Sequence, residues 1–352
     1  MPARVRVAAL GYYGFGNLGD EAVLAGIRTT LDEVFPSDFT VLTANATESS
    51  RLHPGTGTAE RWNLRSMGKT LQGTDLFILG GGSLLQDATS IKSILWYAIA
   101  ARIARRHSRK VLWWGQGIGP LNSPASRLLT RMIAHQADAI TVRDSASATL
   151  LKEIGVRGSI SIVADPAFAL KPATEPDSFQ TRPKPETIMA LRPWREDAGV
   201  ISAFSATFGG KKEITGLPMH LPGDQEFMNR IFGTSFYQTD WRSGGMTVER
   251  TLGIIACAQL TVAMRLHALI FAARCGIPFL AVSYDQKVNA LAHAAGQDDA
   301  LISVKELTAE RLTSALDRVQ NTTAKRRERL SNFALAQGEL ARIPARIAAG
   351  LV

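Results

Sequence analysis

Arg265 and His267 stand two positions apart, between an apolar run at 260–263 and another at 269–273. This pattern predicts a strand that ends before Arg265 and a helix that begins close to His267. A permanent cation and a titratable imidazole beside the N-terminal amides of a helix suit a small polyanion. The pair therefore predicts a site for a phosphate, a carboxylate or both.

Further polar groups follow predicted strands in the same half of the chain. Arg192 follows the strand expected at 187–191, His220 follows 213–219, and Tyr284 and Lys287 follow 279–283. Carboxyl ends of strands face the ligand crevice in open α/β sheets. Arg192 is therefore a candidate anion clamp, and His220, Tyr284 and Lys287 are candidate substrate contacts. Ordinary surface positions remain the alternative for Arg192 and His220.

The first half of the chain offers glycine-rich turns instead. The segment 14–19 fits a bare GxGxxG pattern, but the next predicted strand ends at 41–45 without the acidic residue that a dinucleotide site needs. Asp20 would also place a negative charge where a pyrophosphate should lie. Two interpretations remain: a tight turn with Asp20 as a helix cap, or a loop whose Asn17 and Asp20 contact sugar hydroxyls or remove a proton.

Two later turns allow the same pair of interpretations. Three glycines at 80–82 precede Gln86 and Asp87, and no Walker lysine follows them. This segment is either a tight turn or a loop that brings Gln86 and Asp87 to a ligand. Gln116 lies among tryptophans and glycines at 113–120, where it could read a sugar edge or belong to the core.

Arg143 and Asp144 follow the strand expected at 139–142. They are candidate ligand contacts, although Asp144 could equally cap the helix that starts at 145. A carboxylate in this half of the chain could activate a hydroxyl nucleophile, and Asp20, Asp87 and Asp144 are the candidates.

Apolar β-rich runs alternate with helical patterns through the whole chain, which indicates an α/β fold with parallel sheets. A segment with four prolines at 172–185 interrupts the rhythm. We therefore expect an N-terminal Rossmann-like domain over 1–172, a linker over 173–185 and a C-terminal Rossmann-like domain over 186–352, with a cleft between the domains. The strands expected in the first domain are 5–10, 39–42, 76–79, 111–114, 139–142 and 161–163.

The bulk composition is that of a soluble globular protein, with 352 residues, 45% hydrophobic and 20% charged. The net charge of +9 favours anionic partners, but the basic clusters at 102–110 and 325–329 are not interleaved with aromatic residues, which argues against nucleic acid. They indicate solvated helix faces, or contact with a membrane surface or an anionic substrate. Two cysteines, with no signal peptide and no metal-ligand spacing, favour a cytoplasmic protein without a metal.

Seven short motifs occur in one order and resemble those of the bacterial polysaccharide pyruvyl transferases of the CsaB type. The resemblance covers about residues 5 to 290, and its motifs lie at 16–22, 80–87, 115–120, 142–145, 165–167, 265–269 and 283–288. It implies a fold of two domains like that of the GT-B glycosyltransferases. It also implies transfer of the carbon skeleton of phosphoenolpyruvate to a sugar as a 4,6-linked ketal, with release of phosphate.

In that family the acceptor is expected to be an N-acetylmannosamine residue of a lipid-linked cell-wall polysaccharide precursor, and the product anchors S-layer proteins. Carried over by position, Arg192, Arg265 and His267 would bind phosphoenolpyruvate, and no cofactor is implied. Two other functions remain open: a GT-B glycosyltransferase that uses a nucleotide-sugar, and a noncatalytic polysaccharide-binding protein.

Overall fold

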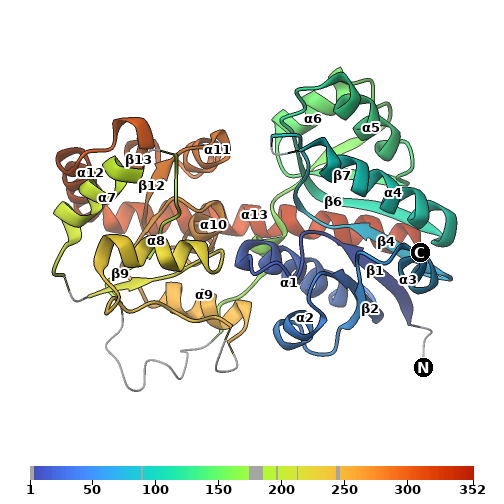
Figure 1. Ribbon diagram of the computed structural model, residues 1–352, viewed down its shortest axis with the longest axis horizontal. Coiled ribbons are helices and arrows are strands. Elements are labelled where there is room, and N and C mark those ends of the chain that lie inside the picture. Colours follow the sequence, from blue (N-terminus) through green and yellow to red (C-terminus); the bar gives the residue numbers. More distant parts are fainter. Residues whose placement is uncertain (1–3, 89, 174–184, 196, 212, 243–245) are drawn as a thin grey trace. The chain divides into compact units, whose positions relative to one another are not determined.

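The computed structural model describes the chain except for residues 1–3, 89, 174–184, 196, 212 and 243–245. The chain divides into two compact units (Figure 1). The N-terminal unit comprises Met1–Phe15, Asp20–Leu170 and Gln337–Val352, and the C-terminal unit comprises Gly16–Gly19 and Lys171–Ala336. Most of the linker expected at 173–185 lies outside the described residues.

The N-terminal unit is built on an eight-stranded sheet with the order β3-β2-β1-β4-β6-β7-β8, and β5 pairs with β6. The described pairings are parallel. Strands buried on both faces read as continuous apolar runs, as in the segment LFIL of β4. The strands are β1 Val5–Leu10, β2 Ser37–Thr43, β3 Gly57–Glu60, β4 Leu76–Leu79, β5 Gly82–Leu85, β6 Lys110–Ile118, β7 Ala139–Val142 and β8 Ile160–Ile162.

Helices cover both faces of this sheet. One apolar core holds the inner faces of α3, α4, α5 and α6, and the other holds α1 and the end of α13. The helices are α1 Leu18–Asp32, α2 Ala46–Leu52, α3 Leu64–Leu71, α4 Ile91–His107, α5 Pro124–Ala134, α6 Ser145–Glu153 and α13 Thr323–Leu351, with a short 3-10 helix at Pro166–Ala169.

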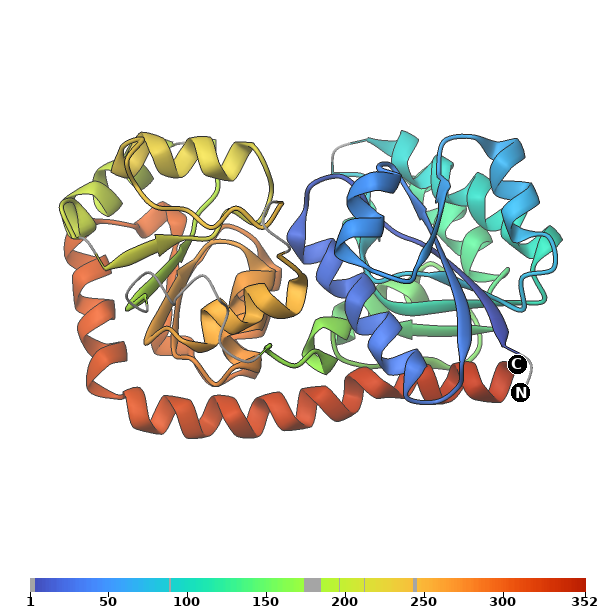
Figure 2. The ribbon, with the colours of Figure 1, turned by 90° about the horizontal axis from the view of Figure 1, so that it is seen from below.

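The last turns of α13 belong to the N-terminal unit, although the sequence pattern groups them with the C-terminal domain. The end of α13 runs beside the N-terminal unit (Figure 2), and Ala345 and Ala348 are buried in the same core as α1. Arg342 also makes a two-pronged contact with Glu33 at the end of α1, at 2.8 and 3.2 Å. Apolar burial and this ion pair both hold the chain end against the first helix.

The C-terminal unit has a five-stranded sheet with the order β10-β9-β11-β12-β13, and its described pairings are parallel. An apolar core packs α7, α8 and α12 against it. The strands are β9 Thr187–Ala190, β10 Ile214–Gly216, β11 Leu260–Ala263, β12 Phe279–Ser283 and β13 Leu301–Ser303. The helices are α7 Asp197–Phe208, α8 Gly223–Phe232, α9 Val248–Ala256, α10 Leu266–Arg274, α11 Gln286–Ala294 and α12 Ala309–Asn321, with 3-10 helices at Asp298–Ala300 and Val304–Glu306.

The strand order reverses once in each sheet, between β1 and β4 in the N-terminal unit and between β9 and β11 in the C-terminal unit. Loops that leave the carboxyl ends of strands at such a switch point are where open α/β sheets bind ligands. The glycine-rich loops after β1 and β4 stand at one switch point, and Arg192 and Arg265 stand at the other. The α/β fold with two parallel Rossmann-like sheets is confirmed.

Candidate functional site

Arg265 follows β11 directly and is held by a buried carboxylate. Its Nε donates to Asp224 Oδ2 at 2.8 Å, and an Nη2 hydrogen goes to the other oxygen of the same group. The Asp224 side chain is fully buried, and that of Arg265 is 17% exposed. Because a guanidinium has five N–H donors, this side-on pairing leaves donors for a second anion.

Asp224 also organises the loop after β10. Its Oδ2 accepts the backbone N–H groups of Met219 at 3.1 Å and His220 at 3.0 Å. One carboxylate thus fixes both the direction of the Arg265 guanidinium and the backbone at His220. Asp224 is not among the predicted site residues, because it lies in an ordinary helical pattern at the start of α8.

His267 lies in the first turn of α10, half-buried, and packs against a glycine from the start of the chain. A Cβ atom built on Gly19 would come within 2.3 Å of His267 Nδ1, so only glycine leaves room for the ring at this position. His267 and Arg265 therefore lie at the N-terminal end of α10, where backbone N–H groups and the helix dipole favour a negative charge.

The short segment Gly16–Gly19 pairs with the loop after β10, inside the C-terminal unit. Leu18 N–H donates to the Met219 carbonyl at 2.8 Å, and Leu221 N–H donates to the Gly16 carbonyl at 3.0 Å. Asn17 and His220 face each other in this antiparallel bridge. The structure thus brings the predicted residues Asn17 and His220 together.

Asn17 also has a structural task. Its Oδ1 accepts the backbone N–H of Gly19 at 3.1 Å, which closes a local turn at the start of α1.

Arg192 lies beside Tyr284 at the same edge of the sheet. Arg192 Nη1 donates to Tyr284 Oη at 2.9 Å, and the guanidinium carbon lies 4.6 Å from the centre of the tyrosine ring. The Trp194 ring packs 4.9 Å from Tyr284. Because β9 and β11 are neighbours, paired at Ala190 and Ala263, Arg192 and Arg265 leave adjacent strands. Two arginine side chains therefore start from adjacent strand ends, an arrangement that suits an anion.

Lys287 is the second residue of α11, three positions after Tyr284. Its backbone N–H is capped by Asp285 at 3.0 Å, which makes Asp285 the N-cap of that helix.

Asp20 lies in the first turn of α1, in the N-terminal unit, and its side chain is largely buried. A Cβ atom on Gly82 would come within 3.0 Å of Asp20 Oδ1, so the glycine turn after β4 closes over the carboxylate. Burial raises the pKa of Tyr13 well above its ordinary value, and the negative charge of Asp20 raises it further. The neighbourhood of Asp20 is therefore apolar, aromatic and rich in glycine.

Two other predicted ligand residues of this unit, Gln116 and Gln86, are hydrogen-bonded within its loops. Gln116 is fully buried, and its Nε2 donates to the Leu79 carbonyl at 2.9 Å and to the Gly80 carbonyl. Gln86 Oε1 accepts the backbone N–H of Ala88 at 2.8 Å. These contacts shape the turn after β4 and the segment that follows β5.

Asp87 ties the segment after β5 to the loop before α5. Its carboxylate accepts the backbone N–H groups of Asn122 at 2.8 Å and Ser123 at 2.9 Å. Slight burial acts to raise the pKa of Asp87, but these hydrogen bonds outweigh it, and the pKa lies below its ordinary value.

Arg143 follows β7 and is surrounded by oxygen atoms. Nη2 donates to Ser83 Oγ at 2.9 Å, Nη1 lies 3.5 Å from Asp165, and Nε lies 3.7 Å from Asp144. Asp144 is also the N-cap of α6, where it accepts the backbone N–H of Ser147 at 2.7 Å. Two carboxylates thus offset the charge of Arg143.

An aromatic cluster beside these loops was not predicted. Arg61 is buried after β3, with its guanidinium carbon 5.0 Å from the Phe15 ring and 4.8 Å from the Trp62 ring. It donates to the carbonyl of Gly11. The Tyr12 ring stacks on Phe15 at 4.1 Å. Such flat faces suit the apolar side of a sugar ring. Arg61 was not a predicted site residue because strand β3, which precedes it, was not predicted.

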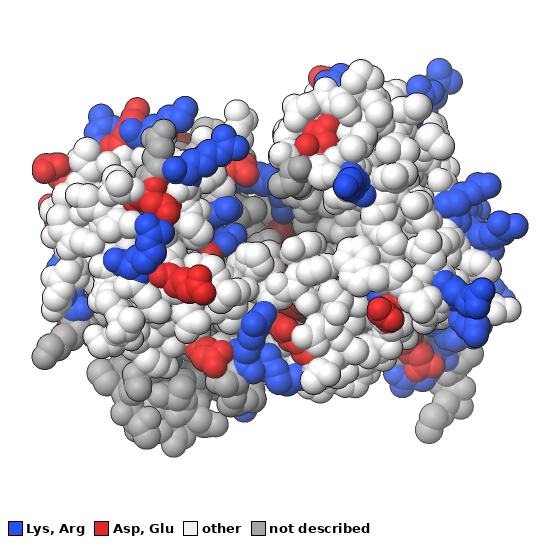
Figure 3. Space-filling view, in the orientation of Figure 1, with Lys and Arg blue, Asp and Glu red and all other residues white. Residues whose placement is uncertain are grey.

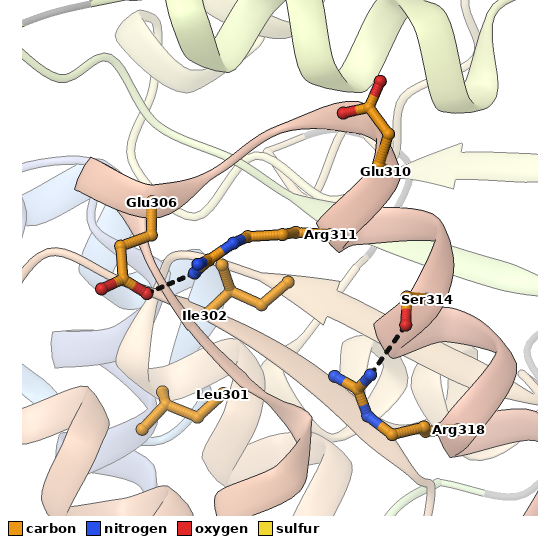
Figure 4. Close-up of a pocket in the computed structure, with 7 residues that line it drawn as sticks. All are labelled: Leu301, Ile302, Glu306, Glu310, Arg311, Ser314 and Arg318. Carbon is orange, nitrogen blue, oxygen red and sulfur yellow. Dashed lines mark hydrogen bonds and ion pairs between the residues drawn. The ribbon is translucent and has the colours of Figure 1, made fainter.

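Two cavities of the C-terminal unit lie away from these residues. One of about 390 Å³ is lined by α12 and β13, with ion-paired Arg311 and Glu306 at its wall (Figure 4). Another of about 260 Å³ lies at the amino ends of β9, β10 and β11, the edge opposite to Arg265. Among the described residues, no three His, Cys, Asp or Glu side chains gather in a way that could hold a metal ion.

The family model of the polysaccharide pyruvyl transferases matches residues 17–286, which include Asp20, Arg192, Arg265 and His267. The chain belongs to the polysaccharide pyruvyl transferase family. A sequence comparison with curated proteins gives no match.

Solved structures share the fold of this pyruvyl transferase family member at low sequence identity. HepE from Anabaena in complex with UDP-glucose has a TM-score of 0.61 and 12% identity, over 99% of this chain and 98% of HepE. The UDP-GlcNAc 2-epimerase of Neisseria meningitidis bound to UDP-GlcNAc has a TM-score of 0.59 and 9% identity, over 99% and 100%. An α-glucosyltransferase with UDP and DNA reaches 0.52 and 9%, over 95% and 96%. These likenesses establish a GT-B-like fold.

Within the described residues, no helix combines the length and the apolar character needed to cross a bilayer.

Proposed function

We propose that this protein transfers the carbon skeleton of phosphoenolpyruvate to a sugar of a lipid-linked cell-wall polysaccharide precursor and forms a pyruvate ketal. The sugar is N-acetylmannosamine, as in the CsaB type, and the product is an anchor for S-layer proteins. The enzyme works in the cytoplasm, on a precursor held at the inner face of the membrane. Membership of the pyruvyl transferase family supports the reaction, and the substrate details rest on the resemblance to the CsaB type.

The observation that carries the donor assignment is the pair of arginines at the switch point of the C-terminal sheet. Arg192 and Arg265 leave the adjacent strands β9 and β11, and His267 follows in the first turn of α10. Phosphoenolpyruvate has a carboxylate and a phosphate, with about three negative charges near neutral pH. Two guanidinium groups and a helix N-terminus complement that charge distribution.

The chemistry needs one proton at carbon and two new C–O bonds. A proton is added to C3 of the donor, and one sugar hydroxyl adds to C2, which gives a tetrahedral phosphate ester. A second hydroxyl of the same sugar then displaces phosphate from C2. The two hydroxyl protons balance the proton taken up at C3 and the proton released with phosphate.

We assign His267 as the acid or the phosphate ligand, and Arg192 and Arg265 as the clamps that hold the carboxylate and phosphate. Asp224 is a positioning residue, because it touches Arg265 and not the donor. His220, Tyr284 and Lys287 complete the donor side.

On the N-terminal unit we assign Asp20 as the base that activates the acceptor hydroxyl. Asp87 and Asp144 each accept backbone N–H groups that define loops and a helix start, so they serve the fold first. Gln86, Gln116 and Arg143 shape or line the loops that would receive the acceptor, and Asn17, which belongs to the C-terminal unit, is a further acceptor contact. The aromatic rings around Arg61 offer a platform for it.

The test is phosphate release from phosphoenolpyruvate in the presence of a synthetic N-acetylmannosamine-containing lipid-linked acceptor. Release that depends on the acceptor, with a mass gain of the product equal to one ketal-bound pyruvate, is the expected result. Arg265→Ala should abolish it. Arg311→Ala is the matched control, since Arg311 is an ion-paired arginine of the same unit on α12.

Two outcomes would replace the proposal. Turnover of a UDP- or GDP-sugar without turnover of phosphoenolpyruvate would make the protein a glycosyltransferase. Binding of polysaccharide by both the parent protein and Arg265→Ala, with no turnover of either donor, would make it a noncatalytic binding protein.

A further inference from the structure

Six large apolar side chains on one side of the N-terminal unit are between 38% and 58% exposed: Trp62, Ile91, Leu95, Ile99, Leu128 and Met132. We call this set the α4–α5 surface. Single exposed apolar residues are ordinary, but a group of them on adjoining elements marks an interaction site. Trp62 joins the group through Trp96 of α4, with ring centres 5.0 Å apart.

These side chains face outward from one layer of helices. The buried residues of α3, α4 and α5 belong to one core, so the three helices cover the same side of the sheet. Their exposed faces therefore look away from the sheet on that side. On α4, Ile91, Leu95 and Ile99 are four residues apart and form one stripe, opposite buried Ala100 and Ala104.

Basic residues border the apolar stripe. Arg102 and Arg106 continue the same face of α4 beyond Ile99, by the helical spacing of three and four residues. Arg127 and Arg131 lie beside Leu128 and Met132 on α5, and all four arginines are exposed. Figure 3 shows Lys and Arg side chains gathered at the edge of this unit, next to a broad uncharged area.

The charge of this layer has one sign. The segments of α3, α4 and α5 contain eight basic residues and no Asp or Glu: Arg65, Lys69, Lys92, Arg102, Arg105, Arg106, Arg127 and Arg131. Arg105 is paired with Asp138 outside the helices at 2.8 Å. On the opposite face, α1 contains Asp20, Glu21 and Asp32 against Arg28, and the end of α13 contains Glu339 against Arg342 and Arg346. The positive charge is thus concentrated on the apolar side of the unit.

We propose that the α4–α5 surface docks on an anionic lipid bilayer. Leucine, isoleucine, methionine and tryptophan side chains enter the boundary between headgroups and acyl chains, and the arginines reach phosphate groups of the lipids. A second copy of this chain is a poorer occupant, because a symmetric contact would set like charges opposite one another. Aliphatic side chains at the centre of the surface likewise do not suit a nucleic acid backbone.

Docking would bring the N-terminal unit to the bilayer that holds a lipid-linked acceptor. This consequence for catalysis rests on the proposed function, whereas the affinity for lipid rests on the surface alone. The two ideas can therefore fail separately.

The first experiment measures flotation of the full-length protein with vesicles of phosphatidylglycerol and phosphatidylcholine, and with phosphatidylcholine alone. Binding should require the anionic lipid and weaken as salt is raised. Leu95→Glu combined with Ile99→Glu should reduce the partition coefficient about tenfold or more, since two apolar side chains are lost from the interface. Arg102→Gln combined with Arg106→Gln should reduce it by about tenfold at low salt.

Matched controls exist for both changes. Leu335→Glu alters a leucine of α13 that is 71% exposed, and Arg157→Gln alters an exposed arginine in the connection after α6. Both should leave vesicle binding unchanged. Circular dichroism and the Tm establish that each variant is folded, and Leu95→Gln with Ile99→Gln replaces the glutamate pair if that pair does not fold.

Equal binding by the surface variants and their controls would overturn the proposal, and so would equal binding to neutral vesicles. A concentration-dependent dimer that the Leu95 and Ile99 changes abolish, without vesicle binding, would also overturn it in favour of a second copy.

A second measurement separates docking from chemistry. The surface variants should keep the rate on a short-chain soluble acceptor and lose rate only on the acceptor embedded in vesicles. Vesicle binding without turnover of phosphoenolpyruvate on either acceptor would refute the proposed function and leave the docking site in place.

Discussion

At the carboxyl edge of the C-terminal sheet, Arg265 shares its guanidinium with one buried carboxylate, and Arg192 lies on a tyrosine ring. At the same edge of the N-terminal sheet, Arg143 lies between Asp144 and Asp165. The two arginines of the first edge face one carboxylate, whereas Arg143 at the second edge faces two carboxylates. This difference underlies our proposal that the C-terminal unit binds the anionic donor and that the N-terminal unit binds the neutral, hydroxyl-bearing acceptor.

The largest effect should come from the base on the N-terminal side. Asp20→Asn removes a proton acceptor with little change of shape, and kcat should fall by about 10²–10⁴. Binding of phosphoenolpyruvate, measured by calorimetry, should be unchanged because that ligand belongs to the other edge. A loss of phosphoenolpyruvate binding in Asp20→Asn would contradict the assignment of the donor to the C-terminal unit and of the base to the N-terminal unit.

Next is the shape of the cation on the C-terminal side. Arg265→Lys keeps the charge but loses the planar fork that spans the two Asp224 oxygens, so kcat/KM should fall by about 10²–10³. Arg143→Lys, the equivalent change at the other edge, should leave the affinity for phosphoenolpyruvate unchanged. Equal losses of donor affinity in the two variants would contradict the comparison.

A smaller effect should follow from crowding His267. In Gly19→Ala the added methyl group meets the imidazole at 2.3 Å and must displace it, so activity should fall about tenfold or more, because small displacements of catalytic groups are costly. Gly199→Ala is the control, since nothing lies within 4 Å of its new Cβ. That change, in the first turns of α7, should keep full activity. Retained activity in Gly19→Ala would contradict the proposal that catalysis needs the His267 imidazole in its position against Gly19.

The smallest effect concerns Asp87, a carboxylate that serves the fold of the N-terminal edge. Its pKa is lowered in the folded state, so its contribution to stability is present above the unfolded value of about 3.9 and is lost as the pH falls through the lower folded value. Asp87→Asn should lower the free energy of unfolding by less than about 1 kcal/mol at pH 7, because the group is close to the surface. The difference from the parent protein should shrink below about pH 4. Denaturant unfolding at several pH values measures this difference in the free energy of unfolding. Asp317→Asn on α12 is the control variant.

Much of the fold follows from the sequence, because its central strands are short apolar runs between glycine and proline signals. β1, β4, β7, β11 and β12 occur with the predicted bounds. The edge strand β3 and its neighbours α2 and α3 were not predicted. The segment GTAE of β3 has no apolar alternation, and its strand character comes from pairing with β2.

The candidate site divides in the same way. Residues directly after strong strands, such as Arg192 and Arg265, could be selected by position alone, and their roles remain proposals. Asp224 and Gly19 could not, since their importance arises from contacts with residues distant in the sequence. Asp87 and Gln116 show the converse: polar residues in glycine-rich turns attract a ligand interpretation, while the folded chain uses them to hydrogen-bond its own backbone.

The pairing of Gly16–Gly19 with the loop after β10 has a consequence for synthesis of the protein. Met219, the partner of Leu18, is added about 200 residues after it, which is roughly 10–40 s at ordinary elongation rates. Ala345 and Ala348 of α13, which share a core with α1, are added later still. Helix α1 therefore waits for segments that are made long after it, and a nascent chain without them would leave apolar side chains of α1 uncovered.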